Sequence, residues 1–363
     1  MSPKINPTLS IIIPAFNEIK RIGKTLASIR AYVRDKRLAC EVIVVDDGST
    51  DGTSDFVEGL IADMPYLRVL RLPKNDGKGA AVKAGMLLAV GQQRLFMDAD
   101  SSTDIREFDK LVPYVAQGFD VVVGSRRIEG AVIKTPQHMI REVLGGMFRT
   151  LTRALVPLGI YDTQNGFKLF SAQVAQEIFG ALETKGWSFD IEALLLARNL
   201  NYCVKEVPII WVNDNQSRLR WTHMIRMFLD ILRLSQTAKQ FLKFCLVGVL
   251  NTVVDFGIYY ALTRGLWTFQ DSILVYKALS YLVATVCSFM VNRYWTFAKM
   301  APIHYGELLR FYATVGLGIF VNVGVQYVAV VIFSLHDLVG VLVAAAATAI
   351  WGFSFAKFFV FKE

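Results

Sequence analysis

Cysteine and histidine are scarce in this sequence, which has four of each among its 363 residues. They are dispersed along the chain, at Cys40, Cys203, Cys245, Cys287, His138, His223, His304 and His336. This dispersal excludes a zinc site with the usual Cys and His spacing. It predicts free thiols in place of a disulfide framework.

The N-terminal part also lacks a long apolar run. Ser10 to Ile13 is too short for the apolar core of a signal peptide, so we expect the first domain to stay in the cytoplasm. Residues 241–361, by contrast, contain long apolar runs, and they raise the mean hydropathy to +0.40. We therefore predict a globular domain at 1–215, an interfacial helix or linker at 216–240 and a membrane domain at 241–363.

Acidic residues are outnumbered by basic ones, and the net charge is +8. Such a charge suits either nucleic acid or an anionic membrane surface with anionic substrates. Many of the basic residues flank apolar segments, which favours the membrane.

Short apolar segments alternate with helical ones in the first 130 residues. The run from Leu9 to Pro14 is continuous and ends at proline, as buried parallel strands do. Similar segments follow at 41–46, 66–72, 94–97 and 119–124, with helices between them. This alternation predicts an α/β domain with a mainly parallel sheet wrapped by helices.

Two carboxylates, Asp98 and Asp100, follow the fourth predicted strand directly. Ligands bind at the carboxyl ends of the strands in such sheets, and hard divalent cations prefer oxygen ligands. The pattern predicts a metal that bridges to phosphate. A helix cap or a solvated turn is the alternative that the pattern alone leaves open.

A glycine-rich stretch, Asn75 to Gly79, opens the third predicted helix. Helix starts of this kind bind phosphate, and Lys78 could neutralise one there. A lysine in an exposed loop is the equally acceptable alternative.

Five ordered motifs carry a family resemblance. They are Ile-Ile-Pro-Ala-Phe-Asn-Glu (12–18), Val-Val-Asp-Asp-Gly-Ser-Thr-Asp-Gly-Thr (44–53), Asn-Asp-Gly-Lys-Gly (75–79), Met-Asp-Ala-Asp (97–100) and Val-Gly-Ser-Arg (123–126). Together they resemble the family 2 glycosyltransferases of the GT-A fold, over residues 8–235. Two further stretches, 162–170 and 186–192, resemble the dolichyl-phosphate β-glucosyltransferases among the polyprenyl-phosphate hexose synthases.

The resemblance implies a division of roles along the site. Residues expected to line the nucleotide-sugar pocket are Pro14, Phe16, Glu18, Val45, Asp47, Lys78, Asp98, Ala99, Asp100 and Arg218. Asp98, Asp100 and Ser102 would hold Mg²⁺ or Mn²⁺, and Arg126 and Arg141 would bind the lipid phosphate. The catalytic set is thus Asp98, Asp100 and Arg126, and Asp190 and Glu192 are either helpers or helix-start residues.

The implied reaction is inverting transfer of a hexose onto polyprenyl or dolichyl phosphate. Gly145 stands where mannosyl relatives can have serine, and Val212 where they have a basic residue, so glucose from UDP-glucose is favoured. GDP-mannose and UDP-N-acetylglucosamine remain alternative donors, and a homo-oligomer is open. No acceptor motif of processive polysaccharide synthases follows the domain.

Two segments after the motifs are amphipathic. Residues 139–155 carry arginines at helical spacing, and they either lie on the membrane or pack on the domain. Residues 218–236 carry Arg226 and Arg233 on one face, which predicts a helix that lies on anionic lipid; a soluble linker is the alternative.

Four apolar segments follow, at about 241–262, 273–297, 308–334 and 338–361, each long enough to span a bilayer. Basic residues flank one side, at Lys239, Lys243, Arg293, Lys299, Arg310, Lys357 and Lys362. The positive-inside rule therefore places both termini in the cytoplasm, and we expect a multi-pass protein of the cell membrane.

The membrane part contains a repeat. Residues 241–248 are similar to 308–316, and the ends of segments two and four match as well, which predicts two parallel repeats. The motifs resemble GtrA-like membrane proteins, so translocation of the lipid-linked sugar is an alternative function of this half. Polar groups at membrane depth are Asn251, Asp255, Asn292 and Asn322, which either bond another helix or line a polar path.

Overall fold

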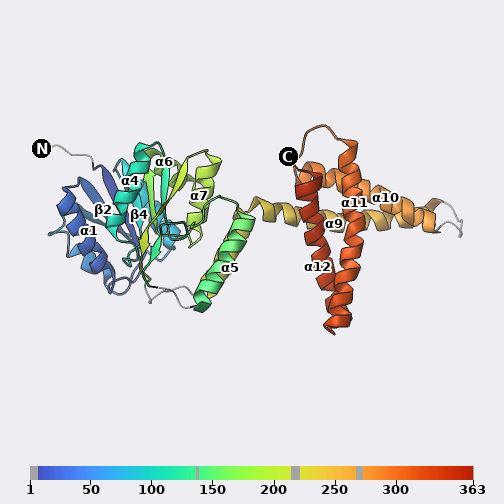
Figure 1. Cartoon of the computed structure of the whole chain (residues 1–363), viewed down its shortest axis with the longest axis horizontal. Helices are drawn as coiled ribbons and strands as arrows, with labels where there is room; N and C mark the ends of the chain where they lie inside the picture. Colours follow the sequence, from blue (N-terminus) through green and yellow to red (C-terminus); the bar gives the residue numbers. More distant parts are fainter. Residues whose placement is uncertain (1–6, 136–138, 214–220, 267–272, 363) are drawn as a thin grey trace. The chain divides into compact units, whose positions relative to one another are not determined.

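The computed structural model describes residues 7–135, 139–213, 221–266 and 273–362 (Figure 1). It divides into two compact units, one ending at Ser235 and one beginning at Gln236. The predicted segment 216–240 is therefore divided between the two units.

The first unit is built on a seven-stranded sheet in the order β3-β2-β1-β4-β7-β5-β8. The strands are β1 Leu9–Ala15, β2 Cys40–Asp46, β3 Leu67–Arg71, β4 Gln93–Met97, β5 Val121–Ser125, β7 Phe167–Ser171 and β8 Val204–Pro208. All neighbours are parallel except β7, which runs antiparallel to both β4 and β5. The predicted mixed, mainly parallel sheet is confirmed. A separate pair joins β6 Val132–Ile133 to β9 Ile210–Trp211.

Helices cover both faces of this sheet (Figure 1). They are α1 Ile22–Lys36, α2 Thr53–Glu58, α3 Lys78–Leu88, α4 Phe108–Ala116, α6 Ala172–Ala181 and α7 Phe189–Asn199. Two more helices, α5 Met139–Leu155 and α8 Trp221–Leu234, pack together against α7 in a smaller cluster. Successive side chains of a strand point to opposite faces, so Ile11 and Ile13 enter one core while Ile12 enters the other. Cores on both faces explain why the strand sequences are continuously apolar.

The parallel strands bring their carboxyl ends to one edge of the sheet. Antiparallel β7 starts at this edge, between β4 and β5. The Asp98 amide donates to the Gly166 carbonyl at 3.0 Å, and the Asn165 side chain donates to the Gly124 carbonyl. Asp98, after β4, and Arg126, after β5, therefore lie on opposite sides of the turn before β7, each one strand away from it.

Helix α8 packs on the first unit. Ile231 is fully buried beside Val156 and Ile191, and the Ser235 hydroxyl donates to the Leu155 carbonyl. On its other side α8 exposes Ile225 and Leu229, which are 60% and 57% accessible. This arrangement fits the predicted interfacial helix, which stays a prediction.

The second unit consists of four long helices, α9 Gln236–Ala261, α10 Ile273–Val291, α11 Tyr305–Tyr327 and α12 Asp337–Phe355. Among the described residues, four helices are long and apolar enough to cross a membrane, as predicted. Each continues into a five-residue π-helical turn, at Leu262–Leu266, Asn292–Thr296, Val328–Ile332 and Ala356–Val360.

The basic residues predicted for one side of the membrane meet at one end of this bundle. Lys243 donates to the carbonyl of Trp295, Arg310 to that of Phe359 and Lys299 to that of Lys362. Arg293 is fully buried there, and its guanidinium donates to the Glu307 carboxylate at 3.0 Å. The starts of α9 and α11 and the ends of the α10 and α12 segments therefore form one basic face.

The two repeats hold different polar groups at matching positions. Asp255 lies five residues before Tyr260, and Asn322 lies five residues before Tyr327. Asp255 accepts hydrogen bonds from Lys277 and from the buried Ser280 hydroxyl, whereas Asn322 donates to Thr348 at 3.0 Å. The first repeat thus carries a charged pair where the second carries a neutral one.

Candidate active site

The turn after β4 is rigidly held. Thr25 of α1 donates to the Ala99 carbonyl at 2.7 Å and lies 2.6 Å from the Ser101 hydroxyl. Ser101 adopts a φ of 59°, a conformation that non-glycine residues rarely have outside constrained turns. The Ser102 amide donates to Asp100 at 2.9 Å, so the two carboxylates are fixed in a turn built for them.

Gly166 makes room for Asp98. A Cβ atom added at Gly166 would fall inside the Asp98 carboxylate, and even the farther oxygen, Oδ1, would be only 2.6 Å away. The antiparallel β7 brings this glycine to Asp98, since Met97 pairs with Phe167. Only glycine at this position lets the Asp98 carboxylate lie where it does.

Lys78, at the start of α3, forms an ion pair with Asp98 at 2.6 Å. Its side chain is 16% exposed, and its ammonium lies over the rings of Phe96 and Trp187, 5.3 and 5.0 Å from their centroids. Burial lowers the pKa of Lys78, but Asp98 and Asp190 raise it more, so the ammonium is held in its charged form. The alternative of a lysine in an exposed loop is wrong.

The glycine-rich stretch before α3 serves mainly for packing. The amides of Asp76 and Gly77 donate to the two oxygens of Asp47 at 2.8 and 2.9 Å. A Cβ at Gly77 would lie 2.5 Å from the Lys185 carbonyl oxygen, and one at Gly79 would lie 2.7 Å from the Phe189 side chain. These glycines thus admit the segment that carries Trp187 over Lys78.

A second ion pair lies fully buried in the same region. Lys168 of β7 pairs with Asp190 of α7, and both side chains are less than 5% exposed. The Lys168 ammonium contacts the same Phe96 ring as Lys78, at 5.8 Å. Asp190 therefore has a cationic partner inside the protein, and the pair packs against Phe96 as part of the buried structure of the site.

Arg126 follows β5 and is held by Asp162. Two guanidinium nitrogens donate to the two carboxylate oxygens at 2.7 and 2.8 Å, and the Arg126 amide donates at 2.9 Å. Trp211 stacks on the guanidinium at 5.1 Å. Arg126 holds the pKa of Asp162 below its usual range, although burial opposes this. The fork of Arg126 is therefore fixed in place with three of its N–H groups still available for an anion.

The charges of the site are unequal. Lys78, Arg126 and Lys168 each pair with one aspartate, and no cation among the described residues pairs with Asp100. Burial and the negative charge of Asp98 raise the pKa of the Asp100 carboxyl. A divalent cation fits such a place, because it would relieve the repulsion between the two carboxylates.

The set of ligands suits magnesium or manganese with a phosphate. Within the described part of the chain no three His, Cys, Asp or Glu side chains gather as a metal site. Mg²⁺ commonly takes one or two carboxylates and completes its shell with water and substrate phosphate. Asp98 and Asp100 match that requirement, and the buried Ser102 donates its amide to Asp100.

The residues predicted for the nucleoside occupy the neighbouring strand ends. Pro14 and Asp47 are buried, Phe16 is 38% exposed, and Glu18 pairs with Arg21 at 2.5 Å. Val45 is completely buried in the core, so its side chain supports the site from below. Asp47 uses both oxygens to hold the loop of Asp76, so its predicted bond to a base would use a second lone pair.

The structure does not describe the side chains of two arginines predicted for the site. Arg218 lies outside the described residues. Arg141 belongs to α5, but its side-chain position lies outside the described part of the structure.

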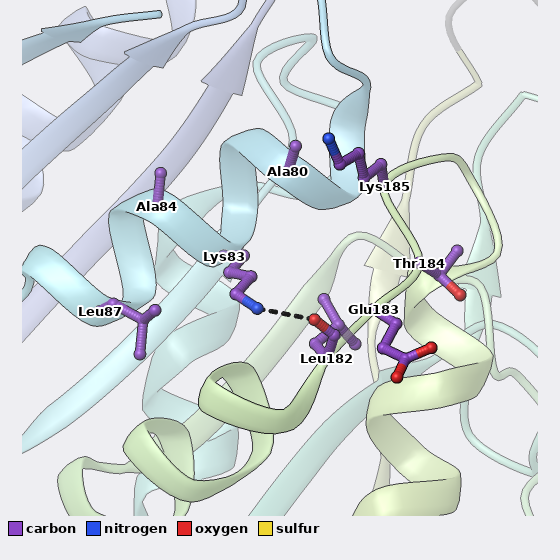
Figure 2. Close-up of a pocket in the computed structure, with 8 residues that line it drawn as sticks. All are labelled: Ala80, Lys83, Ala84, Leu87, Leu182, Glu183, Thr184 and Lys185. Carbon is purple, nitrogen blue, oxygen red and sulfur yellow. Dashed lines mark hydrogen bonds between the residues drawn. The ribbon is translucent and has the colours of Figure 1, made fainter.

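A cavity of about 310 Å³ opens on the outer face of α3 (Figure 2). It is lined by Ala80, Lys83, Ala84, Leu87 and residues 182–185, and none of these belongs to the predicted site. Figure 2 shows Lys83 donating to the Leu182 carbonyl across this cavity, at 2.7 Å. Lys83 thus joins α3 to the segment after α6, away from Asp98.

Several residues of the site were not predicted. Gly166, Lys168 and Asp162 lie in the stretch 162–170, and Trp187 lies in the stretch 186–192. Both stretches were noticed for their resemblance, but no role followed from it for these residues. Their roles depend on contacts across the sheet, which the linear sequence does not display.

Comparisons with known proteins relate the two parts of the chain to two families. The model of the glycosyl transferase family 2 matches residues 10–179, and that of the GtrA/DPMS transmembrane domain matches residues 243–361. The dolichyl-phosphate beta-glucosyltransferase ALG5C of Trichomonas vaginalis is 37% identical over 237 residues, which cover 62% of this chain and 70% of that protein. The dolichyl-phosphate beta-glucosyltransferase of Dictyostelium discoideum is 34% identical, over 64% of this chain and 75% of that protein. Glucosyl-3-phosphoglycerate synthase from Mycobacterium tuberculosis, solved with uridine diphosphate, is similar over 64% of this chain and 81% of its own, with 21% identity and a TM-score of 0.49.

Proposed function

Because this chain belongs to the family 2 glycosyltransferases, we propose that it transfers glucose from UDP-glucose to the phosphate of a polyprenyl or dolichyl lipid. The predicted family and the predicted GtrA-like membrane domain are both confirmed, and the chain is a multi-pass membrane protein. The names of the relatives support glucose and a lipid phosphate. GDP-mannose and UDP-N-acetylglucosamine are the alternative donors.

The observation that carries the proposal is the placement of opposite charges on either side of the turn before β7. The carboxylates follow β4 and Arg126 follows β5, with β7 between them. Neighbouring strands are about 4.8 Å apart, so the two ends lie roughly 10 Å apart. A sugar bridging a metal-bound diphosphate and an arginine-bound phosphate fits that spacing.

The reaction needs little acid–base help from the protein. The acceptor is a phosphate monoester with a second pKa near about 6, so its oxygen is already nucleophilic at neutral pH. This oxygen forms a bond to the anomeric carbon while the bond from that carbon to the donor phosphate breaks, which inverts an α-linked sugar to a β-linked one. No proton has to move in this step, so the reaction does not need a general base.

The residues of the site would then position two anions. Arg126, held by Asp162 and Trp211, presents its remaining N–H groups to the acceptor phosphate. Asp98 and Asp100 would hold Mg²⁺ or Mn²⁺, which supplies charge stabilisation to the departing diphosphate when bound. Lys78 is near enough to Asp98 to assist on the same phosphates.

The membrane unit fits the location of both substrates. The basic face formed around Arg293 and Lys243 would lie on the cytoplasmic side by the positive-inside rule. Nucleotide sugars are made in the cytoplasm, and the acceptor is a membrane lipid. The exposed apolar side of α8 would contact the bilayer surface.

A donor-substitution assay tests the proposal. The purified full chain, in detergent with polyprenyl phosphate, is offered radiolabelled UDP-glucose, UDP-N-acetylglucosamine or GDP-mannose. We expect labelled lipid from UDP-glucose, loss of product in EDTA and recovery with Mg²⁺ or Mn²⁺. Asp100→Ala, which is expected to fold normally, should be inactive. Product from GDP-mannose alone would overturn the proposed donor, and full activity of Asp100→Ala would overturn the metal site.

A second candidate function is translocation of the lipid-linked sugar by the membrane unit. It is favoured by the cluster of Asp255, Lys277 and Ser280. Charged groups at membrane depth are energetically costly, and those that occur there commonly line the path of a substrate or an ion. In proteoliposomes, Asp255→Asn should then retain synthesis and lose movement of product to the far leaflet. Unchanged movement in that variant would count against this role.

A further inference from the structure

We infer that Lys78 is a placeholder cation, which occupies Asp98 until the nucleotide diphosphate arrives and thereby makes metal binding depend on the nucleotide. The inference rests on the proposed metal and donor site and concerns the order in which that site is filled. It starts from the ion pair between the Lys78 ammonium and Asp98 Oδ1, at 2.6 Å.

The pair occupies the oxygen that a metal would use. The other side of the Asp98 carboxylate is packed against Gly166, where even a Cβ atom has no space. A divalent cation bridging Asp98 and Asp100 would therefore meet the Lys78 ammonium at Asp98. Two cations at one carboxylate oxygen repel each other, so metal binding requires Lys78 to move.

Lys78 is built to move at its side chain only. Its backbone is fixed, because the preceding amides of Asp76 and Gly77 bond to Asp47. Its ammonium lies over the rings of Phe96 and Trp187, 5.3 and 5.0 Å from their centroids, and both rings attract it. The ammonium can thus turn from Asp98 to a neighbouring anion without rearrangement of α3.

A diphosphate supplies that anion. In the absence of nucleotide, Lys78 leaves the carboxylates partly neutralised, and a metal gains little by displacing it. With nucleotide present, the phosphates attract Lys78 and the vacated Asp98 oxygen attracts the metal. Each ligand then favours the other, and linkage requires the effect to be equal in both directions.

The test measures metal binding in place of turnover. Mn²⁺ binding to the full chain in detergent is followed by electron paramagnetic resonance, without nucleotide and with UDP, and in a parallel arm with GDP. For the wild type we expect the Mn²⁺ affinity to rise roughly 5- to 150-fold with nucleotide, the usual range for coupled sites. Lys78→Met should bind Mn²⁺ about tenfold more tightly than wild type without nucleotide, and its coupling should be about tenfold smaller, since the diphosphate still supplies metal ligands of its own.

Two matched variants complete the test. Lys83→Met removes the same charge from the same helix, but Lys83 bonds the Leu182 carbonyl and should leave Mn²⁺ binding unchanged (Figure 2). Lys78→Arg keeps a cation at Asp98 and should retain the coupling. Thermal melting of each variant confirms that it folds.

The outcomes separate this inference from the proposed function. Equal Mn²⁺ affinity and equal coupling in wild type and Lys78→Met would overturn the placeholder role and leave the metal site standing. Absence of Mn²⁺ binding to wild type with either nucleotide would overturn the proposed metal site, and the placeholder role with it. Tighter Mn²⁺ binding to Lys78→Met than to wild type without nucleotide, together with a smaller effect of UDP on that variant, would support the inference.

Discussion

Replacement of Gly166 by alanine is the sharpest perturbation of the catalytic geometry. The added methyl group would fall on the Asp98 carboxylate, with Oδ1 only 2.6 Å away and Oδ2 closer still. Cβ atoms essentially never lie within 3.0 Å of another heavy atom that is not bonded to them, so the carboxylate has to swing away. We expect a displacement of roughly 1 Å, because Asp98 is the movable end of a side chain while Gly166 is fixed by the β7 register.

A misplacement of about 1 Å in a positioning group can lower the rate about 100-fold, so we expect Gly166→Ala to lose at least this much of kcat. The rate is measured as labelled lipid formed from UDP-glucose, with both substrates saturating. Gly180→Ala is the matched control, since nothing lies within 4 Å of the added methyl group and activity should not change. A Gly166→Ala enzyme that folds and keeps activity within a few-fold of wild type would refute the reasoning.

Three further variants test other parts of the structure. Arg126→Lys keeps the charge but loses the planar fork and the stack on Trp211, and kcat/KM for polyprenyl phosphate should fall about 10- to 100-fold in initial-rate assays. Asp162→Asn should lower the stability at neutral pH by roughly 3 kcal/mol, because the buried Arg126 loses its counter-ion. The pKa of Asp162 is lowered in the folded state, so the contribution of Asp162 to the stability of the protein is complete above about pH 4 and is lost as the pH falls further. The difference between the melting temperatures of wild type and Asp162→Asn should therefore become smaller in acid. A difference that does not change with pH would contradict the assignment. Arg293→Met removes one of the two cations that pair with the buried Glu307, together with the hydrogen bonds from Arg293 to the carbonyls of Lys299 and Ala301, and should destabilise the membrane unit by about 3–5 kcal/mol, seen as a lower melting temperature in detergent.

Much of the catalytic fold could be predicted because it depends on local patterns. Continuous apolar runs locate β1 and β2, and the carboxylates after β4 show where the site lies. The predicted family follows from motifs that stand in order along the chain. The four membrane helices are similarly predictable, because a bilayer sets their length and composition directly.

The antiparallel strand was harder to foresee. Phe167–Ser171 looks like any short apolar segment, and nothing local indicates that it enters the sheet between β4 and β5 in the reverse direction. For the same reason the function of Gly166 could not be predicted, since its neighbour Asp98 is 68 residues away in the chain. The sequence likewise leaves Lys78 undecided, because its burial depends on the distant Trp187.

The unequal polar groups of the two membrane repeats have a consequence for the symmetry of the bundle. Two similar hairpins with identical interiors would offer an amphiphile two equivalent binding grooves. Here Asp255 of α9 pairs with Lys277 of α10, while at the matching position Asn322 of α11 donates to Thr348 of α12. A charged lipid head group would therefore bind the hairpin of α9 and α10 in preference to the hairpin of α11 and α12. The two repeats are thus similar in fold but not equivalent as binding surfaces.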